Sequence, residues 1–235
     1  MGRAKARTGT LEEVQVRAMF DRIAGVYDLM NSVMTAGLHH RWRQRAADLA
    51  RLGPGDRALD VAAGTGDLAI ELKRRVGPSG EVVGSDFSEG MLHIARTKAV
   101  DVRWEWADAQ ALPYGDDSFS AATVGFGARN FGDLDAGLAE MVRVVRPGGR
   151  VVVLEITVPQ KPPLSSFFRV WFDRIVPLLG RLTGDPEAYD YLPNSVKRFP
   201  GPEPLAGRMA AAGLTDVRWI LTAGGIIALH SGTVR

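Results

Sequence analysis

The chain has 235 residues, of which 46% are hydrophobic and 24% charged, as is usual for a globular protein with one full core. It contains no cysteine, which excludes a disulfide framework, a thiol nucleophile and a thiolate metal site and fits a reducing, cytoplasmic location. The formal net charge of +2 is too small for a basic nucleic-acid-binding domain, and no apolar run reaches the roughly 20 residues that cross a membrane. Residues 1–10 have no apolar core behind their charges, so we expect a frayed tail there.

Residues 11–50 have the apolar spacing of helices. A first helix is predicted over residues 11–32. It contains Asp28 and Asn31, which are poor residues for a helix interior, so we expect it to bend near Gly25 and again near Asn31. The inward face of this helix is predicted to carry Val14, Ala18 and Ile23, broadened by Met19 and Phe20.

A second helix follows, and its apolar residues form a stripe with helical spacing. This stripe consists of Trp42, Ala46, Leu49 and Ala50. We interpret the basic residues of the same stretch as its solvated face. These residues are Arg41, Arg43, Arg45 and Arg51.

A glycine-rich turn then separates a strand from a helix. Residues 57–62 read as a short buried strand, and residues 68–76 have helical spacing. Gly64 and Gly66 let the backbone turn sharply and let a ligand approach it closely, although an ordinary tight turn is the alternative. Asp86 ends the next apolar run, where a Rossmann-like fold places the acid that binds the ribose hydroxyls of an adenosine.

The acid before the turn, Asp60, indicates the kind of ligand. A carboxylate there would repel a pyrophosphate and attract an amino-bearing or cationic group. This disfavours a nicotinamide dehydrogenase, although that fingerprint tolerates the alanine found here at its third glycine. A nucleic-acid-modifying protein would need a longer basic and aromatic stripe than residues 41–43 provide.

Strands and helices continue to alternate along the rest of the chain. Strands are predicted at 81–85, 102–107, 119–124 and 151–156, helices at 91–99, 135–145 and 205–212, and a closing antiparallel pair at 217–221 and 226–230. Ligands of such sheets bind beyond the carboxyl ends of the strands, so Arg129 and Asn130 after the fourth strand are candidate site residues. Glu155 either lies near this site or is a buried acid with its own partners.

Residues 160–200 interrupt the alternation. They hold more apolar side chains than one helical stripe can cover, among them Leu164, Phe167, Phe168, Trp171 and Phe172. We interpret the excess as an apolar lid or a membrane-facing patch. The alternative is that these side chains form a roof over the sheet.

Motifs recur in a fixed order along the chain. They are residues 27–31 with Thr35, His39 and Trp42, then residues 60–67, 86–88, 108–109, 126–130, 143–149, 155–157 and 189–195. In this order they resemble the quinone C-methyltransferases of menaquinone and ubiquinone biosynthesis, which are class I S-adenosylmethionine-dependent methyltransferases. Thr35 and Thr157 replace the family's usual serines and Arg146 its usual lysine, which are mild departures.

The resemblance implies one α/β domain over residues 1–235, with a Rossmann-like, doubly wound, seven-stranded sheet whose last strand is antiparallel. The N-terminal helices would cover the site, and residues 160–200 would form an apolar lid. It also implies S-adenosylmethionine as the methyl donor, S-adenosylhomocysteine as the product and no metal. The implied cofactor-binding residues are Asp60, Gly64, Thr65, Gly66, Asp86, Phe87, Asp108, Ala109 and Gly125, with a simple turn-capping role as the alternative for Asp108.

The implied reaction is methylation of a ring carbon of a polyprenylated quinol, foremost demethylmenaquinol to menaquinol. The corresponding benzoquinol of ubiquinone biosynthesis, or another lipid or phenolic acceptor, is the alternative. Arg129 would hold the phenolate because guanidinium stays charged, and Asn130 would orient the ring oxygen. Tyr27, Asp28 and His39 would supply or relay the base, with a structural role as the alternative for His39. We expect no nucleic-acid partner, peripheral contact with a membrane surface, and a surface compatible with a homodimer.

Overall fold

Short runs of small and aliphatic residues form the central strands, because such side chains pack on both faces of a sheet. The computed structural model describes residues 13–175 and 186–235, so the predicted tail at 1–10 and residues 176–185 of the apolar segment lie outside the described residues. The strands are β1 (Arg57–Val61), β2 (Glu81–Asp86), β3 (Arg103–Trp106), β4 (Phe119–Gly125), β5 (Val145–Ile156), β6 (Leu214–Thr222) and β7 (Ile227–Val234).

The strand order across the sheet is β3-β2-β1-β4-β5-β7-β6, so the chain enters the sheet near its centre and winds outward in both directions. β1 to β5 run parallel, whereas β7 pairs antiparallel with both β5 and β6. The predicted doubly wound, seven-stranded sheet and its antiparallel closing pair are therefore confirmed.

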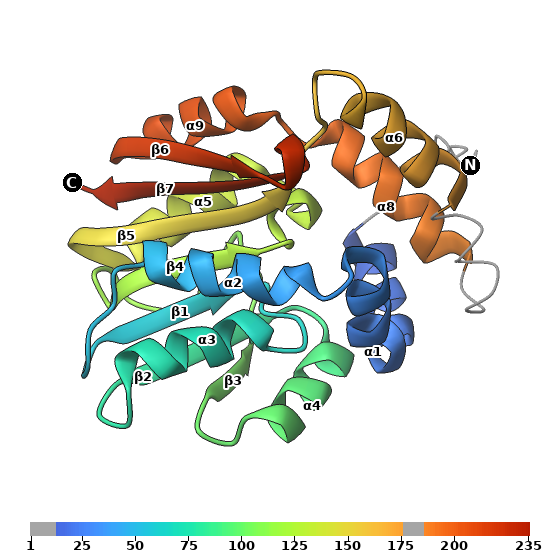
Figure 1. The fold of residues 1–235 in the computed structure, drawn as a ribbon. Helices are drawn as coiled ribbons and strands as arrows, with labels where there is room; N and C mark the ends of the chain where they lie inside the picture. The colour runs from blue at the N-terminus through green and yellow to red at the C-terminus, as the bar shows by residue number, and fades with distance from the viewer. Residues whose placement is uncertain (1–12, 176–185) are drawn as a thin grey trace, which may run out of the picture.

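Helices cover both faces of the sheet (Figure 1). α2 (Leu38–Leu49) and α3 (Asp67–Val76) lie on one face, and α5 (Leu134–Arg143) and α9 (Pro202–Ala211) lie on the other. α4 (Glu89–Lys98) packs against β2 and β3. The alternation along β5 shows how both layers are filled: Val151 and Val153 pack with α5 and α9, while Val152 and Leu154 pack with α2 and α3.

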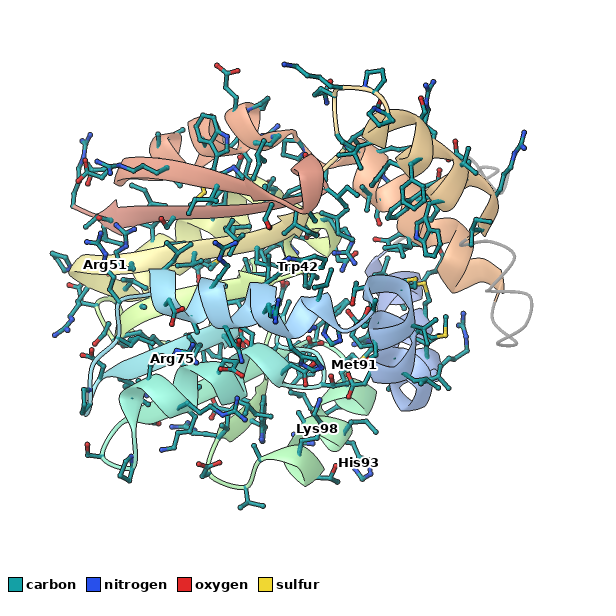
Figure 2. All side chains as sticks on the ribbon, in the orientation of Figure 1. Trp42, Arg51, Arg75, Met91, His93 and Lys98 are labelled. Atoms are coloured by element: carbon teal, nitrogen blue, oxygen red, sulfur yellow. The ribbon has the colours of Figure 1, made fainter. Side chains whose placement is uncertain are left out.

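The remaining helices gather beyond the carboxyl ends of the parallel strands (Figure 1). They are α1 (Glu13–Thr35), α6 (Leu164–Val170), the π-helical turn η2 (Trp171–Ile175) and α8 (Pro186–Arg198). α1 contacts α2, α4 and α8, so segments from both ends of the chain form one cover over this edge of the sheet. Figure 2 shows Trp42 at the end of α2 nearer to this cover and Arg51 just past the other end of the same helix.

The bends predicted in the first helix are wrong, because α1 is one helix from Glu13 to Thr35. Asp28 bonds to groups outside the helix instead of competing for its backbone, and a helix tolerates such a residue. The helix stops only where Ala36 and Gly37 adopt positive φ angles of 48° and 74°.

The inward face predicted for α1 is wrong at two positions, because Val14 is 67% exposed and Ala18 is also exposed. The other predicted residues, Met19, Phe20 and Ile23, do pack inward, in one cluster with Tyr191 of α8. The buried Val16 takes the place of Val14 and Ala18 in this cluster. The reason is that α1 packs on α8 as well as on the sheet edge, and this partner could not be placed from local spacing.

The junction of α5 and β5 differs from the prediction. The helix ends at Arg143, and Val145 already pairs with Phe119 of β4. The next paired residue of β5 is Arg150, so residues 146–149 bulge out of the ladder, with Gly148 at φ 80°. Burial of Val145 against the sheet decides the boundary, and the Pro-Gly-Gly turn becomes a bulge inside the strand.

Trp104 of β3 generates a test of this packing. A methyl group at Gly84 of β2 would lie 2.2 Å from Trp104 Cζ3, and the indole is held by its hydrogen bond to the Ala99 carbonyl at 2.8 Å. We expect Gly84→Ala to lower the free energy of unfolding by roughly 1–3 kcal/mol, measured by urea titration with circular dichroism. Gly207→Ala, on the exposed side of α9 with no atom within 4 Å, is the control and should be neutral or stabilise by up to about 1 kcal/mol. Equal midpoints for both variants would contradict the tight packing.

Candidate active site

The turns after β1, β2, β3 and β4 line a polar cleft at the carboxyl end of the sheet. Every residue predicted to bind the cofactor lines it except Gly66: the cleft wall contains Asp60, Gly64, Thr65, Asp86, Phe87, Asp108, Ala109 and Gly125. Phe20 and Tyr27 of α1 complete the wall. The free space is about 60 Å³, below the roughly 300 Å³ at which small-molecule sites begin, so the ligand-free cleft is narrow.

Gly66 has a different role from the predicted one. It adopts φ 91°, and a Cβ on it would lie 2.3 Å from Trp104 Cη2. Glycine is therefore required here by the turn and by the indole packed beneath it. The cleft itself is formed by the residues on either side of this close approach.

Asp86 ties the first two turns together. Its Oδ2 accepts a hydrogen bond from the Gly64 amide at 2.8 Å, and its Oδ1 accepts one from the Ser88 amide at 2.9 Å. Burial raises the pKa of Asp86 to about 6, against the opposing effect of these two amides. Each carboxylate oxygen can accept a further bond, so Asp86 remains able to bind a ligand hydroxyl.

Asp60 is held on one side only. Its Oδ1 accepts a hydrogen bond from Thr123 Oγ1 at 2.7 Å, whereas its buried Oδ2 has no partner within the described part of the chain. Burial raises the pKa of Asp60 to about 7. An unpaired buried carboxylate oxygen is unfavourable unless a cation or a hydrogen-bond donor meets it, and Asp60 lines the cleft. This geometry suits a ligand that carries positive charge.

Asp108 caps its turn and also lies in the cleft wall. Its Oδ1 accepts hydrogen bonds from the backbone and side-chain nitrogens of Gln110 at 2.9 and 3.2 Å, which caps the turn after β3. It also lines the cleft. The turn-capping bonds therefore fix the carboxylate in the cleft wall.

A second, apolar cavity of about 410 Å³ adjoins the cleft. Its walls come from α1, the start of α2, α6, η2 and α8, and include Met19, Met30, Trp42, Phe168, Trp171 and Phe172. Phe20, Tyr27 and Phe126 line both the cleft and this cavity. The two spaces therefore meet at these three rings.

Arg129 is the buried cation of the apolar cavity. Its Nη1 lies 2.7 Å from Glu155 Oε1 and also contacts the Phe126 carbonyl, while its buried Nε has no partner among the described residues. Burial opposes its charge, but Glu155, Tyr27 and Tyr191 hold the pKa of Arg129 above its usual range. The guanidinium is thus paired through Nη1, while its Nε donor has no partner among the described residues.

Glu155 is the buried acid with its own partners. It is 1% exposed and accepts hydrogen bonds from the amides of Ile156 at 2.8 Å and Arg129 at 3.3 Å, besides the guanidinium. It lines neither the cleft nor the apolar cavity. Its effect on the site is therefore to fix Arg129.

Asn130 lies on the cleft side of the same turn and lines the polar cleft. Its backbone nitrogen donates to the Gly127 carbonyl at 2.9 Å within the 3₁₀ turn η1 (Ala128–Asn130). Its side-chain Oδ1 accepts a hydrogen bond from the Tyr191 hydroxyl of α8 at 3.1 Å. Arg129 therefore lines the apolar cavity and Asn130 the polar cleft, and both also line a third pocket together with Tyr191.

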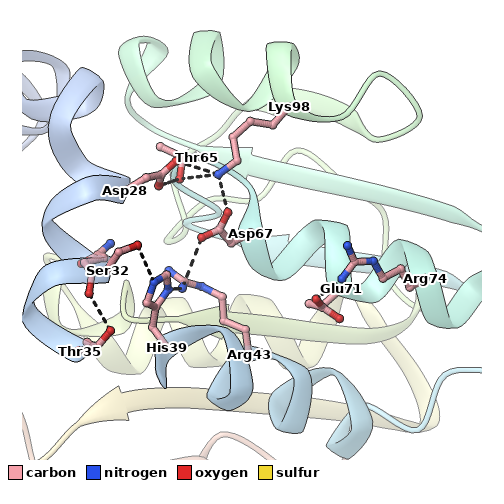
Figure 3. A network of polar contacts seen from close by, with 11 residues as sticks. Asp28, Ser32, Thr35, His39, Arg43, Thr65, Asp67, Glu71, Arg74 and Lys98 are labelled. Atoms are coloured by element: carbon pink, nitrogen blue, oxygen red, sulfur yellow. Dashed lines mark hydrogen bonds and ion pairs between the residues drawn. The ribbon is translucent and has the colours of Figure 1, made fainter. Parts of the chain in front are cut away.

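His39 lines the apolar cavity, but both of its ring nitrogens are engaged (Figure 3). Nε2 lies 3.2 Å from Ser32 Oγ, and Nδ1 contacts the guanidinium of Arg43. Burial and the charge of Arg43 lower the pKa of His39 to about 4, so the ring is neutral at neutral pH. The geometry agrees with the structural role considered for His39 and leaves no free lone pair for a substrate proton.

Arg43 was expected on a solvated face, and this is wrong: it is 5% exposed. It lies 3.4 Å from Asp67 Oδ2 and places its guanidinium 5.4 Å from the centre of the Phe126 ring. Arg43 lies four residues after His39 and directly after Trp42. This spacing is the only feature of the sequence that could have indicated a buried position for its side chain. His39, His40 and Asp67 come close enough to hold a metal ion, but the guanidinium that contacts His39 and Asp67 would repel one.

A set of polar contacts connects α1 to the glycine-rich loop (Figure 3). Thr65 Oγ1 donates to Asp28 Oδ1 at 2.5 Å, and Lys98 of α4 pairs with Asp28 at 2.9 Å and with Asp67. Asp28 is thus engaged by partners and does not reach the apolar cavity. We call the set Asp28, Ser32, His39, Arg43, Thr65, Asp67 and Lys98 the α1 clasp.

Comparison with a family model identifies the family to which the chain belongs. The model described as the ubiE/COQ5 methyltransferase family matches residues 8–234. The chain belongs to this family. A nicotinamide dehydrogenase, the alternative left open by the glycine-rich turn, is thereby excluded.

Relatives and solved structures agree with the assignment of the chain to this methyltransferase family. A demethylmenaquinone methyltransferase of Thermus thermophilus is 50% identical over 219 residues, covering 91% of this chain and 99% of that protein. A ubiquinone/menaquinone biosynthesis C-methyltransferase of Teredinibacter turnerae is 42% identical over 226 residues, covering 93% of this chain and 91% of that protein. The crystal structure of a SAM-dependent methyltransferase of Thermotoga maritima has a TM-score of 0.67 at 20% identity, covers 93% of this chain and 99% of its own, and shows the shared fold.

This family and fold imply S-adenosylmethionine as the methyl donor, and the charge of the cleft wall suits it. A sulfonium and an ammonium group give that molecule positive charge, and the cleft wall carries Asp60, Asp86 and Asp108. The unpartnered Oδ2 of Asp60 is the most specific feature, since it needs a donor or a cation from outside the chain. A pyrophosphate would meet only repulsion from the same carboxylates.

Asp60 generates a pH-dependence test in the ligand-free protein. Its folded pKa of about 7 lies above the usual 3.8, so between these values the unfolded chain has lost a proton that the folded protein keeps. Stability therefore falls as pH rises through this window, and Asn at this position cannot titrate. We expect the difference in unfolding free energy, wild type minus Asp60→Asn, to decrease by about 2–4 kcal/mol from pH 4 to pH 8 in urea titrations. The exposed Asp101→Asn is the control, and parallel curves for wild type and Asp60→Asn would show that burial does not perturb Asp60.

Proposed function

We propose that this methyltransferase methylates a ring carbon of a polyprenylated quinol, foremost demethylmenaquinol to menaquinol. The observation that carries the proposal is that a polar, acid-lined cleft and an apolar cavity holding a buried arginine meet at Phe20, Tyr27 and Phe126. The 50% identity to a protein named demethylmenaquinone methyltransferase, against 42% for one named for both quinones, supports the naphthoquinol. The corresponding benzoquinol is the alternative substrate.

On the cleft side, each acidic residue can supply a different interaction with the cofactor. When bound, S-adenosylmethionine provides an electrophilic methyl group on a sulfonium. Asp60 would meet its positively charged end, Asp86 would accept hydrogen bonds from ribose hydroxyls, and Asp108 would face the adenine. Because these carboxylates are held by Thr123, by backbone amides and by Gln110, they need no rearrangement to do so.

On the cavity side, the acceptor must be the reduced ring. A quinone is electron-poor, whereas a quinol that loses a hydroxyl proton places negative charge on the neighbouring ring carbon. A phenolic pKa near 10 means that the anion must be stabilised at neutral pH. Arg129 can do this with the Nε donor that Glu155 leaves free. Of the residues considered for the base, only Tyr27 lines both spaces.

The reaction proposed here is tested by methyl transfer from labelled S-adenosylmethionine to demethylmenaquinone, supplied reduced or oxidised. We expect transfer to the reduced ring only, with product identified by mass spectrometry. Arg129→Lys keeps the charge but loses the second donor face, so kcat should fall at least about ten-fold. The affinity for S-adenosylhomocysteine should stay unchanged, because Arg129 does not line the cleft. Native turnover in Arg129→Lys would remove Arg129 from the phenolate role, and equal transfer to the oxidised ring would refute the quinol mechanism.

We further propose that the mouth of the apolar cavity docks on a membrane. Val33, Leu38 and Phe167 both line the cavity and are 56%, 44% and 56% exposed, and Leu164 and Val170 extend the exposed apolar surface along α6. A polyprenyl tail stays in the bilayer, so the protein has to come to it. Among the described residues, no helix has the length and apolar character needed to cross a bilayer.

The apolar segment has one set of buried side chains and one set of exposed side chains. Phe168 and Phe172 are buried and roof the sheet edge, while Leu164, Phe167 and Val170 face outward. The exposed Lys161 and Arg169 lie on the same segment and could meet anionic head groups. Apolar side chains flanked by cations are the usual composition of an interfacial helix.

Phe167→Ser tests this docking in a flotation assay with anionic liposomes. Phe167 stacks on Trp171 at 5.9 Å but is half exposed, so the substitution should leave folding intact. We expect wild type to float with the vesicles at low salt and Phe167→Ser to float several-fold less. Val100→Ser is the control, because Val100 is 94% exposed but lies after α4 and lines neither space. If wild type never floats at any salt or lipid composition, another protein must deliver the tail.

A further inference from the structure

α8 brings a phenol into the reaction centre. Tyr191 is 7% exposed, lines the apolar cavity, and donates its hydroxyl to Asn130 Oδ1 at 3.1 Å. Asn130 in turn lines the polar cleft. This hydrogen bond therefore runs from the wall of the substrate space to the wall of the cofactor space.

The direction of the hydrogen bond decides what Asn130 can do. A primary amide has two nearly isosteric orientations, and only the one with nitrogen toward a phenolate is attractive. A hydroxyl that donates to Oδ1 places the amide nitrogen on the opposite branch, away from α8. Among the described residues, the Asn130 side chain has no hydrogen bond other than the one from Tyr191, since its bond to Gly127 involves only the backbone. Without that hydroxyl, neither orientation of the amide is selected.

The surrounding charges explain why the Tyr191 hydroxyl donates to Asn130 and does not accept from it. Arg129 and Arg198 both act on the phenol electrostatically, and the Arg198 guanidinium lies 5.8 Å from the centre of its ring. Positive charges attract the phenolic oxygen and turn its hydrogen away, which directs that hydrogen to Asn130 Oδ1. Val16, Met19 and Met30 of α1 pack around the ring and hold its position.

We propose that Tyr191 is a positioning residue for methyl transfer: its hydroxyl orients the Asn130 amide so that the nitrogen points into the polar cleft, toward a quinol oxygen where the cleft meets the apolar cavity. This rests on the proposed function of the site. Arg129 then stabilises the charge of the phenolate, and Asn130 fixes the direction in which its ring faces the cleft. The segment that interrupts the sheet alternation thus completes the reaction centre in addition to covering it.

Tyr191→Phe removes only the hydroxyl and keeps the ring packing. The first measurement needs no substrate: the side-chain amide signals of Asn130 in full-length protein labelled with ¹⁵N-asparagine, assigned through Asn130→Ala. We expect these signals to shift and to exchange faster with water in Tyr191→Phe. Tyr114→Phe is the matched control. The Tyr114 hydroxyl also donates a partly buried hydrogen bond, to Glu105 Oε2 at 3.0 Å, but Tyr114 lines neither the cleft nor the apolar cavity. Unchanged Asn130 signals in Tyr191→Phe would overturn the proposal.

The second measurement is a double-mutant cycle on kcat with demethylmenaquinol. We expect Tyr191→Phe to lower kcat about ten-fold, with the dissociation constant of S-adenosylhomocysteine changed less than about two-fold. In the Asn130→Ala background, Tyr191→Phe should have no further effect, because it acts through Asn130. The same loss in both backgrounds would show that Tyr191 acts independently. If wild type fails to methylate any quinol, the proposed function is refuted, and the amide signals still decide whether Tyr191 orients Asn130.

Discussion

The α1 clasp is the constraint on which the rest of the site depends. Asp28 of α1 meets Thr65 of the glycine-rich loop, and Lys98 and Arg43 meet Asp67 at the start of α3. Burial disfavours the charge of Asp67, but Arg43 and Lys98 hold its pKa below the usual value, so the contacts persist at neutral pH. Since α1 supplies Phe20 and Tyr27, these charges set where cleft and cavity meet.

Two charged side chains inside the site have only part of their hydrogen-bonding capacity satisfied. Asp60 has one oxygen bonded to Thr123 and one without a partner among the described residues, and Arg129 has one face on Glu155 and a free Nε. In a ligand-free protein each such group lowers stability, as the raised pKa of Asp60 indicates. The two unsatisfied groups have opposite charge and lie in adjoining spaces, which matches a cationic donor and an anionic acceptor.

The sequence predicted what depends on neighbouring residues in the chain. Asp60, Asp86 and Asp108 lie at or just past the carboxyl ends of strands, and parallel topology alone brings such ends together. It could not predict the continuous α1 or the buried Arg43, because both depend on packing between segments that local spacing does not reveal. The role of Tyr191 also required the structure, since α8 meets η1 only through the fold.

The double use of α1 has a kinetic consequence. Its side chains Phe20 and Tyr27 line the polar cleft and the apolar cavity at once, so a displacement of α1 changes both spaces together. Exchange of a nucleoside in the cleft and exposure of a ring in the cavity to water are thereby coupled through one helix. The strength of the contacts that hold this helix to the glycine-rich loop then bears on the rate of exchange as well as on the geometry of the site.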